Sequence, residues 1–271
     1  MSRSSRERAH IALSPHRVAM VWLTSGWRGT RVTDRRILSC APSNAQPTWS
    51  TALDALSDML RQPGPLKAPA TVILSNHFVR YLTLPWNAEL VTRTEEFEFA
   101  RARFVQVFGD KAQHWAVRSA DAPARCERLA AATDAALLEA LTGTLGAAGL
   151  TLASCQPALM AQFNASLDRV GEDAWLVSVE RGRLVIAWIA RGHWRSVRVR
   201  PVNNGVVALH DILEQESMLI CGPAVHQNVL VSATDDVVLD MQGLSVEPLG
   251  ARGGPDAAED APFALAMAGV R

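Results

Sequence analysis

The chain contains 271 residues, 48% of them hydrophobic and 20% charged, with 27 basic and 27 acidic side chains. Such a composition is typical of a folded globular protein and excludes an intrinsically disordered chain. A net charge of zero excludes a global field that would attract nucleic acid or an anionic membrane, so no nucleic-acid partner is expected.

The termini and the cysteines indicate a reduced, cytoplasmic protein. No apolar run approaches the roughly 20 residues that a bilayer-spanning helix needs, and the N-terminus lacks the apolar core of a signal peptide. The N-terminal arginines fit a solvated basic tail (Arg3, Arg6 and Arg8). The four cysteines have no C-x-x-C spacing, which argues against zinc (Cys40, Cys126, Cys155 and Cys221). We therefore expect no membrane span and no metal.

The N-terminal part of the chain has the pattern of three strands, a helix and a further strand. Residues 11–13 and 17–32 are rich in β-branched and aromatic side chains, which predicts a first strand followed by a hairpin or a three-strand meander. Residues 49–60 place apolar side chains on one helical face. Residues 71–75 (TVILS) form a short apolar run that is typical of a buried strand.

Additional predicted strands and helices follow this first β-β-β-α-β pattern. Residues 78–84 predict an extended run, and Thr92 followed by Glu95 forms a capping box that starts a helix over residues 93–108. The apolar stripe of this helix is interpreted as core rather than as a cofactor pocket (Phe97, Ala100, Phe104 and Phe108). The remaining predictions are strands near 114–119, 125–131 and 151–155 and helices over 134–148 and 157–167.

The C-terminal part repeats the pattern of the N-terminal part. Residues 183–199 (RLVIAWIARGHWRSVRV) align with residues 17–32 (RVAMVWLTSGWRGTRV), so that Trp188 matches Trp22. A strand over 175–177 precedes this repeat, and a helix over 206–220 and a strand over 228–232 follow it. The alignment predicts that the two segments superpose across a pseudo-two-fold axis, with Ser75 near Ser232.

These elements predict an α/β protein in which a β-β-β-α-β unit occurs twice. The first half spans residues 9–156 and contains an inserted α+β subdomain at about residues 77–133. The second half spans residues 157–271 and lacks an equivalent insertion.

A duplicated β-β-β-α-β unit with a small domain inserted in its first half resembles the actin-like, ribonuclease-H-like ATPases. Within that group the sequence LSNHFVRYLTLPW (residues 74–86), the capped helix that follows it and the C-terminal FALAMAGVR are similar to PilM-type pilus-assembly proteins. They are also similar to the cytoplasmic part of GspL-type type II secretion proteins. The layout covers nearly all of the chain.

The resemblance implies a nucleotide site at which this chain departs from the pattern. Hydrolysis in the superfamily needs an aspartate on the first strand of each half, with nearby glycines that admit phosphate. Ala12 and Ser178 occupy the aspartate positions, and Ser14 and Glu180 occupy glycine positions. Ser232 replaces a glycine of the adenosine loop. The sequence therefore predicts a pseudo-ATPase without catalytic residues or cofactor, rather than an enzyme.

The resemblance also suggests a binding partner. PilM-type proteins bind the cytoplasmic tail of a bitopic inner-membrane subunit in a groove between the first-half domain and its insertion, and GspL-type proteins also dock the secretion-type ATPase. By this resemblance the chain is a cytoplasmic scaffold recruited to the inner membrane face. Five residues are predicted to contact the tail (Phe78, Arg80, Leu84, Trp86 and Arg101).

Two other functions stay open at this point. One is an active ATPase or a sugar-kinase-like phosphotransferase with a diverged site, which needs an acidic residue that these positions do not supply. The other is an actin-like protein that forms filaments. The fold does not separate them, because one fold hosts many functions.

Overall fold

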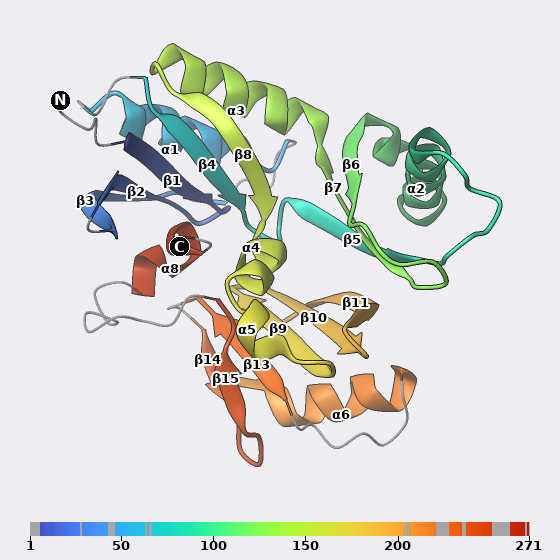
Figure 1. Ribbon diagram of the computed structural model, residues 1–271. Helices are drawn as coiled ribbons and strands as arrows, with labels where there is room; N and C mark the ends of the chain where they lie inside the picture. Colours follow the sequence, from blue (N-terminus) through green and yellow to red (C-terminus); the bar gives the residue numbers. More distant parts are fainter. Residues whose placement is uncertain are drawn as a thin grey trace. The chain divides into compact units, whose positions relative to one another are not determined.

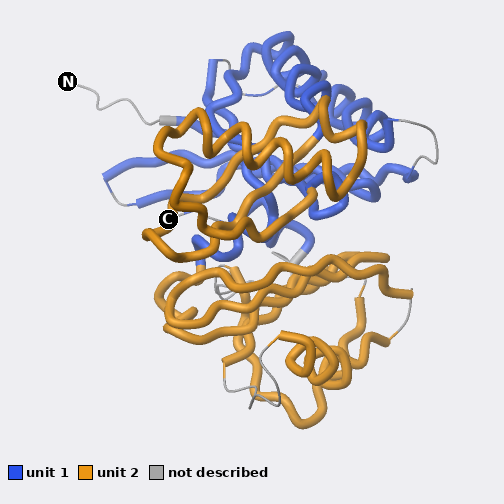
Figure 2. The backbone as a smooth tube through the Cα atoms, turned by 90° about the vertical axis from the view of Figure 1, so that its right-hand side faces the viewer, with its two compact units in different colours: residues 1–79, 134–165, 253–271 blue, residues 80–133, 166–252 orange. Residues whose placement is uncertain are grey.

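The structure is a computed structural model, and its chain divides into two compact units (Figure 2). Unit 1 comprises residues Met1–Val79, Asp134–Ala165 and Gly253–Arg271, and unit 2 comprises Arg80–Thr133 and Ser166–Arg252. The structure describes residues 6–27, 29–42, 47–62, 64, 67–203, 206–220, 228–234, 237–250, 261–268 and 270. Within these ranges no helix is both long enough and apolar enough to cross a bilayer.

Unit 1 is built on a five-stranded sheet in the order β3-β2-β1-β4-β8. The strands are β1 (Arg6–Leu13), β2 (Arg17–Gly26), β3 (Gly29–Ser39), β4 (Pro69–Leu74) and β8 (Thr151–Pro157). β1, β2 and β3 pair antiparallel, and β4 and β8 extend the sheet in parallel. The central strands are continuous apolar runs because both of their faces are covered, whereas the edge strand β3 alternates half-buried and exposed residues.

Helices cover both faces of this sheet. In Figure 1, α1 (Ser50–Leu60) and α3 (Ala135–Ala147) lie on one side and α8 (Ala264–Met267) on the other. Ala52, Leu56 and Met59 are buried at helical spacing on α1. Asp134 caps α3 by accepting from the Ala136 amide at 3.0 Å, and its other carboxylate oxygen accepts from Trp49 Nε1 at 2.9 Å. Capping and packing therefore join α1 to α3.

The C-terminal segment packs against the first strands of unit 1. It consists of a 3-10 turn over Ala261–Phe263 followed by α8. Phe263 and Ala266 form one core cluster with alternate residues of β1 and β2 (Ala12, Ala19, Val21 and Leu23). The sequence analysis assigned residues 157–271 to the second half and did not predict that the C-terminal segment packs on the first half.

His10 of β1 makes the stability of this packing depend on pH. The side chain is buried, and burial and the nearby Arg8 hold the pKa of His10 below its ordinary value of 6.5, opposed by a hydrogen bond to the backbone of Ala266. Below pH 6.5 the unfolded chain binds a proton that the folded chain does not, so the free energy of unfolding should fall as pH is lowered. The slope from His10 is at most about 1.4 kcal/mol per pH unit and vanishes above that pH.

Chemical denaturation at a series of pH values tests this prediction. The His10→Gln variant, which cannot titrate, is the control, because other groups also titrate in this range. The difference in unfolding free energy between the two proteins should shrink as the pH falls from 7 toward 5. A difference that is constant with pH would contradict the prediction.

The inserted part of unit 2 is a three-stranded sheet in the order β5-β7-β6, covered by one long helix. Its elements are β5 (Val79–Leu84), α2 (Arg93–Phe108), a 3-10 turn (Asp110–His114), β6 (Trp115–Ser119) and β7 (Arg128–Asp134). Phe104 of α2 is fully buried and packs against Phe108 and Trp115 with ring centroids 5.8 and 6.3 Å away. The interpretation of this stripe as core is confirmed. β7 begins three residues later than predicted because a turn brings the Cys126 amide to the Pro123 carbonyl.

The second sheet of unit 2 has the order β11-β10-β9-β13-β15. Its strands are β9 (Ala174–Glu180), β10 (Arg183–Ala190), β11 (His193–Pro201), β13 (Val229–Ala233) and β15 (Val246–Pro248). The predicted helix 206–220 is shorter, because residues Val206–Ala208 form β12, which pairs with β14 (Val238–Asp240). α6 (Leu209–Ile220) then packs on the sheet, where buried Glu216 makes ion pairs with Arg198 and Arg200 at 3.3 and 3.2 Å.

The strand registers show that the two halves share one plan. Leu13 pairs with Val18 in the first half, and Val179 pairs with Leu184 in the second, the same register displaced by 166 positions. A register shift follows Trp22 on β2, and another follows the matched Trp188 on β10. The duplication predicted from the aligned segments is therefore confirmed.

The predicted structural equivalence of Ser75 in the first half with Ser232 in the second half was wrong by two positions. The Ser75 amide donates to the Leu13 carbonyl, and the Thr234 amide donates to the carbonyl of Val179, which matches Leu13. Ser75 is therefore equivalent to Thr234. The error arose because the apolar runs TVILS and NVLVS look alike in sequence, while only the pairing with the first strand defines their register.

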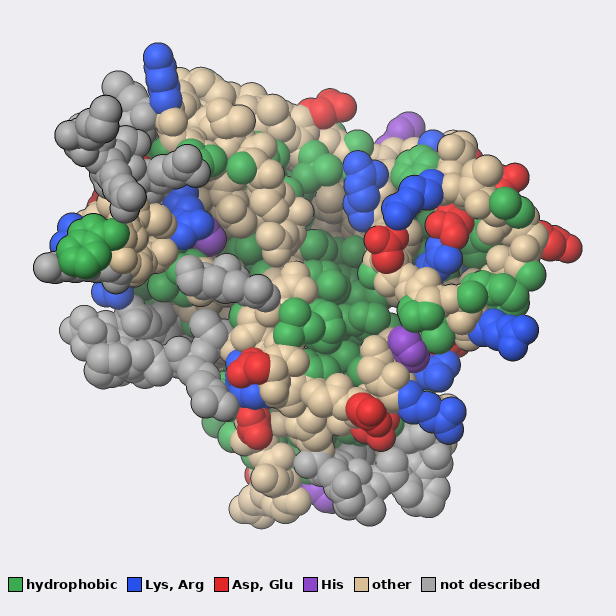
Figure 3. All heavy atoms as spheres, viewed as in Figure 1, with side chains coloured by type: hydrophobic (Ala, Val, Ile, Leu, Met, Phe, Trp, Pro, Cys, Tyr) green, Lys and Arg blue, Asp and Glu red, His purple; other side chains and the backbone are tan. Residues whose placement is uncertain are grey.

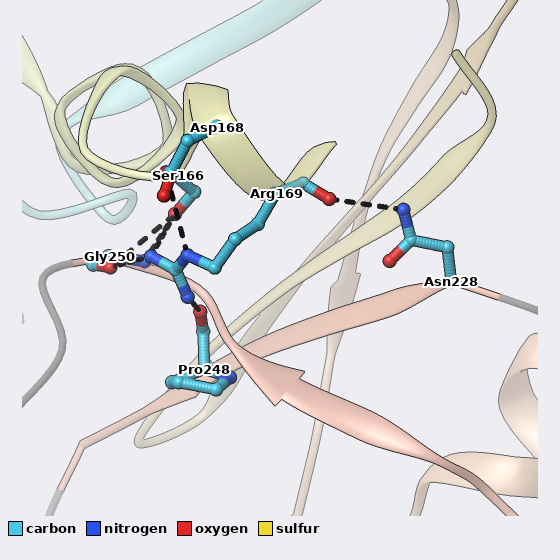
Figure 4. Close-up of polar contacts among 6 residues, drawn as sticks. All are labelled: Ser166, Asp168, Arg169, Asn228, Pro248 and Gly250. Atoms are coloured by element: carbon cyan, nitrogen blue, oxygen red, sulfur yellow. Dashed lines mark hydrogen bonds and ion pairs between the residues drawn. The ribbon is translucent and has the colours of Figure 1, made fainter. Parts of the chain in front are cut away.

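A cluster of polar contacts holds the end of β15 against α5 (Leu167–Val170) (Figure 4). The Arg169 guanidinium donates to the carbonyls of Pro248 and Gly250 and to Ser166 Oγ. Ser166 is fully buried and accepts from the Gly250 amide at 2.7 Å. On the other side Asn228 Nδ2 donates to the Val170 carbonyl at 2.9 Å. These bonds satisfy backbone carbonyls of the edge strand β15, of Gly250 and of α5.

Candidate functional site

The first hairpin of unit 1, β1 and β2, is the one that the resemblance to actin-like ATPases assigns to phosphate binding. Ala12, at the predicted aspartate position, is buried against Phe263 and Ala266. The turn that joins β1 to β2 is closed by its own groups, since Ser14 Oγ donates to the Arg17 carbonyl at 2.8 Å and the Arg17 amide donates back to the Ser14 side chain and carbonyl. Pro15 has no amide hydrogen to offer a phosphate.

The equivalent hairpin in unit 2 carries a buried charge cluster. Ser178 and Glu180 are both buried on β9, and Glu180 is the cross-strand partner of Arg183. Burial lowers the pKa of Arg183, the neighbouring Arg80 lowers it further, and Glu180 and Tyr81 oppose both effects. The carboxylate at the expected glycine position therefore balances arginine side chains.

No metal-binding group of side chains was found within the described ranges. Nowhere in these ranges do three or more His, Cys, Asp or Glu side chains converge so that they could hold a metal ion. Ser232 is half-buried on β13, opposite Ser178. Asp235 and Asp236, two adjacent carboxylates in the sequence, lie outside the described residues.

A pocket forms in the inserted part of unit 2, where β5 ends. β5 stops at Leu84 because Pro85 follows and cannot donate to a neighbouring strand. The chain then turns at Asn87, whose side chain accepts from the Glu89 amide at 2.9 Å and whose carbonyl accepts from the Leu90 amide at 3.4 Å. This turn brings Leu90 back beside Leu84 and Trp86 in the pocket wall.

The start of α2 fixes the other side of the pocket. Thr92 Oγ1 accepts from the Glu95 amide at 3.2 Å, and the Glu95 carboxylate accepts from the amides of Thr92 and Val91 at 2.8 and 2.9 Å, as the predicted capping box requires. Hydrogen bonds from the amides of Thr92 and Val91 lower the pKa of Glu95. The cap sets where α2 begins, and thus where Glu96 and Phe99 face the pocket.

The pocket combines an apolar wall with a charged edge. Its apolar members come from the end of β5, the following turn and α2 (Leu84, Pro85, Trp86, Leu90 and Phe99). Its polar members are Asn87, Glu96, Ser119 and Arg128. Glu96 and Arg128, both in the pocket lining, form an ion pair at 2.5 Å, with side chains that are 27% and 21% exposed. Trp86 is 38% exposed, so an incoming group can reach it.

The structure brings two of the five predicted contact residues together. Leu84 and Trp86 both line the pocket. Arg80 is half-buried at the start of β5 in the charge cluster with Arg183, and burial lowers its pKa. Phe78 is buried in unit 1. Arg101 lies over the Phe97 ring, 5.9 Å from its centroid, and 3.9 Å from Glu98.

Several pocket residues were missed by sequence reasoning. Glu96 and Phe99 are three residues apart on α2 and share a face, so helical spacing was a usable signal for them. Ser119 and Arg128 come from β6 and β7. No local signal points to them, because only the pairing order of the sheet brings those strand ends to the end of β5.

Similarity to solved structures identifies the fold of this chain. No protein-family model matches the sequence, and no curated protein matches it. The cytoplasmic domain of EpsL, an inner-membrane component of the type II secretion system of Vibrio cholerae, is similar in structure with a TM-score of 0.56 at 12% identity. That match covers 98% of this chain and 100% of the EpsL chain.

Two further solved structures show the same architecture. The PilM-PilN type IV pilus biogenesis complex contains a chain that matches with a TM-score of 0.61 at 12% identity, over 100% of both chains. A Bacteroides thetaiotaomicron protein with an actin-like ATPase fold and unknown function matches with a TM-score of 0.53 at 11% identity, over 88% of this chain and 92% of that one. At such identities the likeness shows the fold, and this chain has the actin-like ATPase fold that its sequence predicted.

Proposed function

We propose that this chain is a non-catalytic scaffold of a type IV pilus or type II secretion-like assembly platform, and that it binds the cytoplasmic tail of a bitopic inner-membrane subunit. The protein is cytoplasmic in this proposal and is held at the inner membrane face by that tail. A secretion-type ATPase is a second candidate partner. The observation that carries the proposal is the pocket around Trp86, in a chain whose fold is also that of EpsL and PilM.

The chemistry of the two hairpins supports the non-catalytic part. Actin-like ATPases need a carboxylate near each hairpin to hold Mg²⁺ or to orient the attacking water. Ala12 has no ligand atom in its side chain, and Ser178 offers a neutral hydroxyl. Glu180 is buried beside Arg183. These side chains favour a scaffold over the ATPase and sugar-kinase alternatives.

The composition of the pocket supports the binding of a peptide. The exposed part of Trp86, beside leucine and phenylalanine side chains, offers an apolar surface to a side chain of the tail. Glu96 and Arg128 offer both an acceptor and a donor to a peptide backbone. Aromatic anchors surrounded by a polar rim are the usual centre of such interfaces. We propose that an apolar side chain of the tail packs against Trp86. The groove predicted between the first-half domain and its insertion stays a separate proposal.

A thermal-shift titration with Mg-ATP tests the non-catalytic part. A ligand present at 100 times its dissociation constant stabilises a protein by about 2.7 kcal/mol, which is readily measured as a rise in melting temperature. We expect no rise at millimolar Mg-ATP, because Ala12 and Ser178 cannot hold the metal. A clear rise would favour the active ATPase instead. Titration with the partner tail is the positive control, since it should raise the melting temperature.

A further inference from the structure

The hairpin that joins β2 to β3 ends in an exposed tryptophan. Trp27 is 82% exposed, more than twice the exposed fraction of Trp86. Gly26 and Gly29 flank the turn, and Gly29 has a φ of 106°, a conformation that residues other than glycine rarely adopt. The hairpin therefore holds a large aromatic side chain at its tip in contact with solvent.

The same end of the sheet is basic. β1 starts where β2 ends, and the parallel strand β4 starts at the same end, so Arg8, Arg31 and Lys67 lie at the sheet end that carries Trp27. Arg31 and Lys67 are exposed. The Arg8 guanidinium donates to Ser25 Oγ at 2.8 Å and Thr30 Oγ1 at 3.1 Å, and so fixes the base of the hairpin. Figure 3 shows hydrophobic and basic side chains side by side over the β2–β3 end of unit 1.

The net charge of the chain is zero, but its basic and acidic residues are unevenly distributed along the sequence. The first 36 residues contain eight arginines and only two acidic residues, Glu7 and Asp34. Asp34 is paired with Arg36 at 2.8 Å. The rest of the chain carries 19 basic and 25 acidic residues. The total charge of zero gives no attraction to an anionic membrane, whereas the local excess of arginine in these residues does.

We propose that the β2–β3 hairpin contacts the surface of an anionic phospholipid membrane, with Trp27 in the headgroup layer and Arg31 and Lys67 facing lipid phosphates. The indole is suited to that layer because it joins an apolar ring system to one polar N–H. Each exposed basic side chain adds attraction to an anionic surface within a Debye length. A single aromatic tip at a basic sheet end fits a broad flat surface better than it fits single-stranded nucleic acid, which is bound by several stacked aromatics along a groove.

Vesicle co-sedimentation of the purified full-length chain, with no membrane subunit present, tests this proposal. The protein should sediment with phosphatidylglycerol-containing vesicles and not with phosphatidylcholine vesicles, and high salt should release it. Trp27→Ala should weaken the partition about tenfold. Arg31→Ser should weaken it about fivefold, the usual effect of one basic side chain. Circular dichroism should show both variants folded, because neither side chain is buried.

The control variant separates this inference from the proposed function. Trp86→Ala removes an aromatic side chain from unit 2, so it should leave vesicle binding unchanged even where it weakens tail binding. Absence of binding to anionic vesicles would overturn the inference, and so would binding that Trp27→Ala and Arg31→Ser leave intact. Binding to single-stranded DNA that matches or exceeds vesicle binding, and that depends on Trp27, would assign the hairpin to nucleic acid and likewise overturn it.

Discussion

Replacing Arg169 with alanine is expected to lower the free energy of unfolding by about 3 kcal/mol. The Arg169 side chain is only 6% exposed, and its guanidinium donates to the carbonyls of Pro248 and Gly250 and to Ser166 Oγ. Alanine removes all of these charge-assisted hydrogen bonds, two of which go to buried residues, Ser166 and Gly250. Arg169→Lys should recover only part of the loss, because an ammonium group does not reach several acceptors in the plane that a guanidinium spans.

Urea denaturation of the purified variants measures this effect. Arg93→Ala is the matched control, since Arg93 pairs with Asp121 at 3.4 Å and the two side chains are 86% and 88% exposed. An exposed pair of this kind contributes about 0–1 kcal/mol. A loss for Arg169→Ala no larger than that of the control would mean that the contacts in Figure 4 do not stabilise the end of β15.

Replacing Trp86 with alanine is expected to lower the affinity for the cytoplasmic tail by about 2 kcal/mol, or roughly thirtyfold. Trp86 is the largest side chain of the pocket, and its loss removes the aromatic wall against which the tail anchor packs. Phe99→Ala should also weaken binding, because Phe99 closes the same pocket from α2. Arg80→Ala should have a smaller effect, because Arg80 lies outside the pocket in the charge cluster with Arg183.

Calorimetric titration against the tails encoded beside the gene provides the measurement. Trp27→Ala is the matched control, because it removes the same kind of side chain from unit 1. Each variant is compared with the wild type only after its melting temperature has been shown to be unchanged. Wild-type affinity in a folded Trp86→Ala variant would move the tail site away from the pocket and leave Trp86 as a packing residue.

The amino-acid sequence alone predicted most of the elements and the fold. Hydrophobic periodicity and turn residues carry this information locally, so α2 was predicted with the same bounds that the structure shows, and its capping box was read directly from Thr92 and Glu95. The duplication was visible because aligned tryptophans and arginines survive in both copies. The positions without a carboxylate, Ala12 and Ser178, also follow from the sequence, and the register confirms that they are equivalent.

Only the tertiary structure decided which distant residues meet. Arg128 reaches the pocket because β7 lies between β5 and β6, and Phe263 covers Ala12 because the C-terminal segment returns to the first half. These contacts join residues that are far apart in the chain, and no local pattern encodes them. The same holds for the equivalence of Ser75 with Thr234, which depends on inter-strand hydrogen bonds. Local propensity thus determined the elements of this protein, while strand pairing and packing determined its candidate sites.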